Sequence, residues 1–104
     1  SVPLSPTALA ANTDNYNPGT ARHLRLSASS AVNLTGIVAG VDGQELFIWN
    51  VGTTNTITLK HQVTSTAANQ FFTTTGADLA LAAGKCAIAM YDGTTSRWRV
   101  SLLP

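Results

Sequence analysis

Short runs in which hydrophobic and polar residues alternate make up most of this chain. The alternation has a period of two, which is typical of β-strands with one buried face. Asp42-Gly43 and Asp92-Gly93 are glycine turns of the type that joins hairpin strands. Only residues 8–11 suggest a helical turn, which is too short to be stable alone. The runs predicted as strands are residues 22–26, 31–38, 45–51, 56–62, 78–82, 85–91 and 97–103.

About eight short strands separated by turns predict an all-β fold. We expect an antiparallel β-sandwich of jelly-roll type, formed by residues 20–104. Residues 1–19 contain Pro3, Pro6 and Pro18 and show no periodic pattern. Because proline removes a backbone donor from a sheet, this segment is predicted to be an extended N-terminal arm, either disordered or laid across a neighbouring subunit.

The strands carry more apolar residues than one buried face requires. Residues 45–51 are apolar on both faces, with Phe47 and Trp49 sharing one of them. A strand of this kind is buried on two sides. Because no helix is predicted to cover the second face, we expect identical subunits to cover one another, with Phe47, Trp49 and Tyr91 at the subunit interface. The alternative is a monomer in which the N-terminal arm covers these residues.

Composition and charge exclude several classes of function. The 104 residues suit one domain, and only 11% of them are charged, with a formal net charge of +1. The few basic residues are scattered, whereas a nucleic-acid interface needs clustered Lys and Arg, so we expect no nucleic-acid partner. No apolar run approaches the ~20 residues that span a bilayer, so no membrane insertion is expected. Cys86 is the single cysteine, so packing rather than disulfide bonds must stabilise the fold.

Residues with catalytic chemistry are few, and each has a structural explanation. His23 and His61 are the two histidines, and neither has an acidic neighbour in sequence. Cys86 lies within an apolar strand and is interpreted as an inert buried thiol. Asp42 and Asp92 each precede a glycine, which turn formation explains. We therefore predict that the chain is not an enzyme and has no catalytic residues, cofactor or metal site.

Aromatic side chains suggest one alternative function. If exposed, Tyr16, Trp49, Tyr91 and Trp98 could stack on sugar rings, as in a carbohydrate-binding module. Their positions along the strands make Trp49 and Trp98 more simply residues of the core or of an interface, whereas Tyr16 is the least constrained.

The order of several short motifs is informative. They are DNYNP at 14–18, LRLS at 24–27, NLTGI at 33–37, GVDG at 40–43, WNVG at 49–52, ITLK at 57–60, STAANQF at 65–71, GADL at 76–79 and YDGTTSRWR at 91–99. In this order they resemble C-terminal modules of tailed-bacteriophage virion proteins, namely tail-fibre, tail-spike and head-fibre or decoration proteins.

This resemblance implies a non-enzymatic structural β-module on the exterior of a phage particle. It implies a homotrimer, made in the cytoplasm of the bacterial host, that contacts other capsid or tail proteins. We expect the arm around Pro3, Pro6 and Tyr16 to anchor the module to such a protein. In the carbohydrate-binding alternative, the module attaches to polysaccharide on the host surface.

Overall fold

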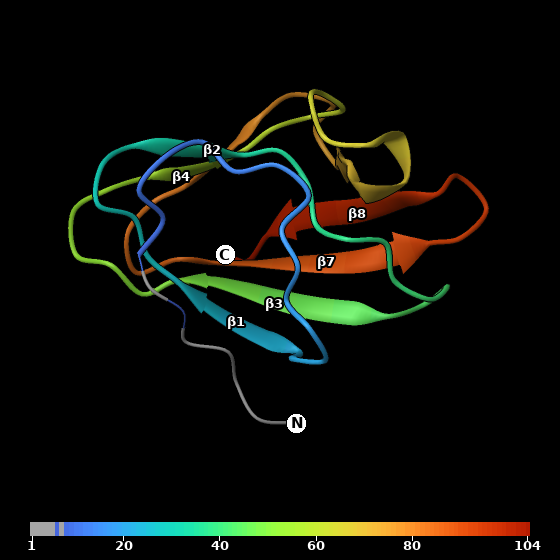
Figure 1. Ribbon diagram of the computed structural model, residues 1–104, viewed down its shortest axis with the longest axis horizontal. Helices are drawn as coiled ribbons and strands as arrows, with labels where there is room; N and C mark the ends of the chain where they lie inside the picture. Colours follow the sequence, from blue (N-terminus) through green and yellow to red (C-terminus); the bar gives the residue numbers. More distant parts are fainter. Residues whose placement is uncertain (1–5, 7) are drawn as a thin grey trace.

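The computed structural model describes residue 6 and residues 8–104, which form eight short strands and one turn of 3-10 helix (Figure 1). The expected all-β fold with about eight strands is confirmed. No helix among these residues is long and apolar enough to cross a membrane. The elements are β1 His23–Leu26, β2 Val32–Leu34, β3 Glu45–Asn50, β4 Ile57–Leu59, η1 Ala67–Asn69, β5 Phe71–Thr73, β6 Leu79–Leu81, β7 Cys86–Asp92 and β8 Arg97–Leu102.

The strands form two sheets packed as a sandwich. The larger sheet has the order β1-β3-β7-β8-β5, and the smaller has the order β2-β4-β6. Up to β7, the chain passes to the other sheet at every connection, so β7 and β8 are the only consecutive strands that pair among the described residues. Three pairs are parallel, namely β1–β3, β2–β4 and β5–β8. This mixed pairing differs from the expected antiparallel, jelly-roll-like arrangement.

The two Asp-Gly turns have different roles. Asp92-Gly93 lies in the connection between β7 and β8, which pair antiparallel with Asp92 opposite Arg97, as a hairpin requires. The Asp42-Gly43 hairpin prediction was wrong, because β3 follows this turn but pairs with β1 and β7. Instead, the Asp42 carboxylate accepts a hydrogen bond from the Gly93 N–H at 2.8 Å, so one turn supports the other.

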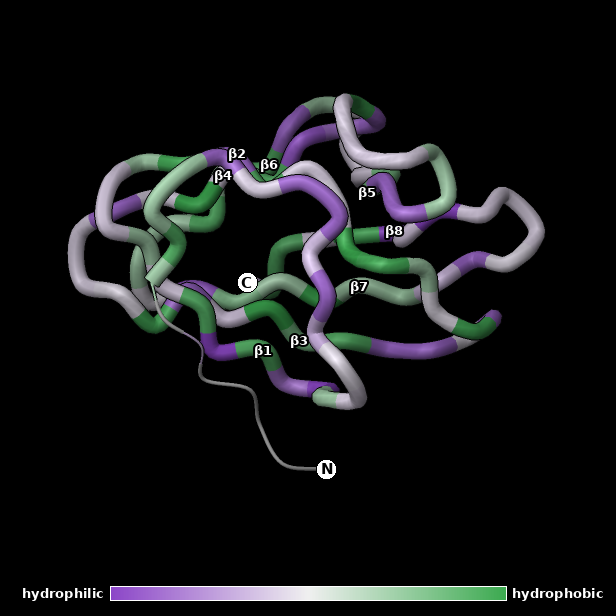
Figure 2. Tube along the Cα trace, viewed as in Figure 1, coloured by the Kyte–Doolittle hydropathy of each residue, from purple (hydrophilic) through white to green (hydrophobic). Residues whose placement is uncertain are grey.

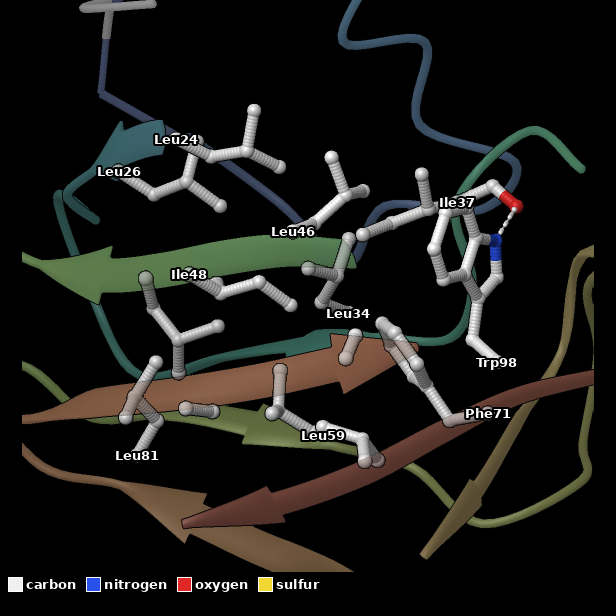
Figure 3. Packing of buried hydrophobic residues seen from close by; sticks show 14 of the residues in the cluster. Leu24, Leu26, Leu34, Ile37, Leu46, Ile48, Leu59, Phe71, Leu81 and Trp98 are labelled. Atoms are coloured by element: carbon white, nitrogen blue, oxygen red, sulfur yellow. Dashed lines mark hydrogen bonds between the residues drawn. The ribbon is translucent and has the colours of Figure 1, made fainter. Parts of the chain in front are cut away.

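The core lies between the sheets and consists mainly of leucine and isoleucine side chains (Figure 3). Leu24 and Leu26 face inward, whereas Leu102 at the end of β8 is partly exposed. Trp98 closes one end of the core, and its indole N–H donates to the Ile37 carbonyl oxygen at 2.9 Å. One buried polar side chain, Asn50, joins the sheets, because its amide donates to the Leu81 carbonyl oxygen at 2.9 Å.

The described part of the N-terminal arm lies along its own domain. Backbone N–H groups of Leu9, Thr13 and Tyr16 donate to carbonyl oxygens between residues 27 and 36 at 2.8–3.0 Å. The arm, blue in Figure 1, thus runs beside β2 before the chain enters β1. Leu9 belongs to the core and Tyr16 packs against it. Residues 9–16 are therefore an integral part of the sandwich.

A polar network around the buried Thr35 and Ser65 hydroxyls fixes the arm to two loops. The Thr35 hydroxyl is hydrogen bonded to the Asp14 carboxylate and to the Ser65 hydroxyl, each at 2.6 Å. Ser65 also accepts from the Asn15 N–H at 2.9 Å. Asn15 adopts a positive φ of 49°, and its side-chain oxygen accepts from the Thr66 N–H at 2.9 Å. The DNYNP motif is therefore explained by docking of the arm.

Candidate binding surface

One face of the five-stranded sheet packs on the smaller sheet, and the other is directed to solvent. Because side chains alternate along a strand, the residues between core positions form this second face. Hydrophobic residues, green in Figure 2, occupy much of β3 and β7. Met90 is 46% exposed and Trp49 is 38% exposed. This surface is termed the outer face and comprises His23, Arg25, Glu45, Phe47, Trp49, Cys86, Ile88, Met90, Arg99 and Ser101.

Tyr91, which was expected at the subunit interface, lies inside the sandwich instead. It is 5% exposed, and its hydroxyl donates to the Ala68 carbonyl oxygen at 2.8 Å. Its ring meets Trp98 edge to face, with ring centroids 5.0 Å apart. Strand β7 is apolar on both faces, and the face with Tyr91 is the one turned to the core. The outward residues of β7 are therefore Cys86, Ile88 and Met90.

Phe47 and Trp49 do lie on the outer face, in an aromatic group with His23. The strand register places His23 beside Phe47, and their rings stack with centroids 4.7 Å apart and an interplanar angle of 7°. The Trp49 indole N–H donates to His23 Nδ1 at 3.4 Å. The Arg22 guanidinium lies 5.9 Å from the centroid of the Phe47 ring. The His23–Phe47 stacking and the indole hydrogen bond hold the three rings in a defined orientation.

A shallow hollow of about 320 Å³ adjoins this aromatic group, at the β1 edge of the sheet. It is lined by His23, Arg25, Trp49 and Val51. Arg25 and Trp49 are brought together because they are register partners in β1 and β3. Within the described residues, the Arg25 side chain makes no hydrogen bond or ion pair, so its positive charge faces solvent beside the indole ring.

A second hollow, of about 400 Å³, lies nearby and is more polar. Its two charged lining residues, Arg22 and Glu45, form an ion pair with a nitrogen–oxygen distance of 2.8 Å. The charges in this hollow are therefore balanced, unlike Arg25 in the first one. Its lining residues are Thr20, Ala21, Arg22, Gln44 and Glu45.

Every carboxylate of the chain has a structural partner. Asp14 and Asp42 accept the bonds described above, and Glu45 pairs with Arg22. Asp78 accepts from the His61 backbone N–H at 2.8 Å and pairs with Lys60, and both contacts lower its pKa. The Thr95 hydroxyl likewise lowers the pKa of Asp92. A general acid in glycoside hydrolysis needs a raised pKa, so these two shifts have the opposite direction.

The two histidines lie at opposite edges of the large sheet, His23 in β1 and His61 beside β5. His61 Nδ1 accepts from the Thr73 backbone N–H at 3.1 Å, which is a structural contact. Burial raises the pKa of the Cys86 thiol, which disfavours the reactive thiolate. In the described part of the chain, no three His, Cys, Asp or Glu side chains converge in a group that could hold a metal ion.

The structure describes two of the three residues that were expected to anchor the arm, Pro6 and Tyr16. Pro3 lies outside the described residues, and Pro6 is half-buried. Tyr16 holds the arm on its own domain: its N–H donates to the Gly36 carbonyl oxygen at 3.0 Å, and burial raises the pKa of its hydroxyl. Tyr16 is therefore placed by its own domain and not by contact with another protein.

Sequence reasoning missed Arg25 and its pairing with Trp49. The motif LRLS shows that Arg25 points away from Leu24 and Leu26. It gives no indication that β1 pairs with β3, because parallel partners are joined through another strand. The sequence signal that could have found the site is that Arg25 and Trp49 each lie between buried residues of a strand and therefore point outward.

Comparison with known proteins identifies one related family. A family model described as the phage depolymerase C-terminal beta sandwich domain matches residues 5–99. Neither the curated proteins nor the solved structures gave a match. The match agrees with the two-sheet architecture and covers the arm from residue 5 onward and the outer face except Ser101.

Proposed function

The chain belongs to the family of phage depolymerase C-terminal β-sandwich domains, and from this premise we propose that it is a non-catalytic structural module on the exterior of a phage particle. Membership of the family associates the chain with bacteriophages. The engagement of all five carboxylates in turns, networks and ion pairs supports a role without chemistry of its own. The proposed role is to hold subunits together and to contribute to host attachment.

We propose that the module is a homotrimer in which the outer faces pack together. The observation that carries this proposal is the open apolar centre of that face, formed by Phe47, Ile88 and Met90. Burial of about 800 Å² per partner is usual for a stable interface, and apolar area supplies most of its free energy. The Arg99–Asp92 ion pair, with a nitrogen–oxygen distance of 3.3 Å, already satisfies charges beside this centre. Trp49, at the end of β3, is placed at the margin of the interface.

Met90→Glu is expected to convert the trimer into a monomer. Met90 is exposed in the isolated subunit, so the substitution leaves the core intact. It places a negative charge at the centre of the proposed interface, beside Glu45 on the neighbouring strand. Light scattering at micromolar concentration should give three times 10.8 kDa for the natural chain and 10.8 kDa for the variant.

Ala80→Glu is the matched control for this experiment. Ala80 is also exposed on a strand, but it lies on the outward side of the small sheet. This variant should keep the mass of the natural chain. A natural chain that is monomeric throughout the concentration range, or equal dissociation of both variants, would contradict the trimer.

We further propose that the first residues, around Pro3 and Pro6, contact a neighbouring virion protein. The arm is held on its own domain from Leu9 onward, so a deletion that tests this contact must end before Leu9. A chain lacking residues 1–7 is expected to keep its melting temperature and to lose binding to particles assembled without the protein. Unchanged particle binding by the shortened chain would refute the contact.

A further inference from the structure

We propose that the hollow lined by His23, Arg25, Trp49 and Val51 binds a sugar unit that carries a carboxylate. This inference rests on the proposed role in host attachment and specifies the class of ligand. The hollow lies beside the centre of the proposed subunit interface, so both functions can coexist on the outer face.

Trp49 presents an exposed indole ring to the hollow. Trp49 is 38% exposed, and its only polar atom is already hydrogen bonded to His23 Nδ1 at 3.4 Å. His23 is in turn stacked on Phe47. The indole plane is therefore oriented before any ligand arrives, which reduces the entropic cost of binding. An exposed, oriented indole face suits the C–H groups on one side of a pyranose ring.

The charge of the Arg25 side chain favours an anionic ligand in the hollow. The lining contains the Arg25 guanidinium and no carboxylate, and within the described residues Arg25 has no polar partner. A guanidinium matches the geometry of a carboxylate, which it can bind through two parallel hydrogen bonds. An anionic sugar therefore complements this hollow better than a neutral one does.

The volume of the hollow suits a single sugar unit. The hollow measures about 320 Å³, at the lower end of the ~300–1,000 Å³ typical of small-ligand sites. Val51 bounds it on the side beyond Trp49 and supplies apolar contact. One sugar unit of a longer chain fits this space, with the remaining units directed to solvent.

The test uses the two tryptophans as internal reporters. Tetragalacturonate is added to the ¹⁵N-labelled chain, and the two indole N–H signals are followed by NMR. The Trp49 signal, assigned by its loss in Trp49→Phe, is expected to shift, whereas the signal of the buried Trp98 stays in place. The neutral methyl ester of the same oligosaccharide should bind at least about tenfold more weakly.

Three variants make the test specific. Arg25→Gln is expected to weaken binding of tetragalacturonate about tenfold, and Trp49→Ala to abolish it. Arg22→Gln removes one positive charge on the same strand edge but outside the hollow, so it should bind as the natural chain does. Absence of a Trp49 shift, equal binding of the ester, or an equal loss in Arg22→Gln would each overturn the proposal.

Light scattering of the same samples separates this inference from the proposed assembly. A trimer whose Trp49 signal does not move refutes the acidic-sugar site and leaves the interface standing. A monomer whose Trp49 signal moves refutes the interface and leaves the site standing.

Discussion

Trp98→Ala is expected to remove about 3–5 kcal/mol from the free energy of unfolding, the largest loss from any single truncation considered for this chain. Trp98 is 1% exposed, meets Tyr91 edge to face and closes one end of the core. Its removal leaves a cavity and also leaves the buried Ile37 carbonyl oxygen without its donor. Urea unfolding followed by circular dichroism measures the loss.

Two further variants separate the contributions at this position. Trp98→Phe keeps a six-membered aromatic ring but removes the donor to Ile37 and part of the indole volume, so a smaller loss of about 1–3 kcal/mol is expected. Trp49→Ala truncates the other tryptophan, on the outer face, and should cost no more than about 1 kcal/mol in the free energy of unfolding. Similar losses for Trp49→Ala and Trp98→Ala would show that the assignment of core and surface tryptophan is wrong.

Gly36→Ala is the second substitution with a large expected effect, about 1–3 kcal/mol or more. A Cβ on Gly36 would lie 2.7 Å from the Ser65 hydroxyl oxygen and closer still to the Asn69 carbonyl oxygen. One of these groups must shift, and Ser65 is part of the network that holds the arm. Faster hydrogen exchange at the Tyr16 N–H, which donates to Gly36, is therefore expected together with the lower free energy of unfolding.

Gly76→Ala provides the comparison for Gly36→Ala. Gly76 has a φ of 76° and open space around its Cα, so alanine there costs only backbone strain, about 1 kcal/mol. This variant should leave exchange at Tyr16 unchanged. If Gly36→Ala costs no more than Gly76→Ala and leaves the arm protected, close packing at Gly36 does not hold the arm.

The strands could be predicted from sequence where alternation is long and uninterrupted. β3, β7 and β8 lie within one residue of their predicted limits, because each has several apolar residues at alternate positions. β5 was not predicted, since Phe71 and Phe72 are adjacent and a threonine run follows. Apart from the β7–β8 hairpin, the pairing could not be predicted, because partners that are not consecutive strands leave no local turn signal.

The orientation of β7 shows the limit of period-two reasoning for the candidate site. Alternation separates Ala87, Ala89 and Tyr91 from Cys86, Ile88 and Met90, but both sets are apolar. Which set is buried depends on which face of β7 packs against the smaller sheet, and the tertiary fold decides this. Strand β3 is also apolar on both faces, and the structure buries Leu46 and Ile48 and turns Phe47 and Trp49 outward. Predicting the Arg25–Trp49 pair would have required the register between β1 and β3, which are not consecutive strands.

The passage of the chain from one sheet to the other at nearly every connection has a consequence for biosynthesis. Among the described strands, only β7 and β8 pair with no other strand between them in sequence. The last strand, β8, lies between β7 and β5 in the large sheet. Contacts of high sequence separation must form together, which slows folding. A nascent polypeptide on the ribosome thus cannot complete the five-stranded layer until β8 is made, and the domain should become protease-resistant only after this final strand has emerged from the exit tunnel.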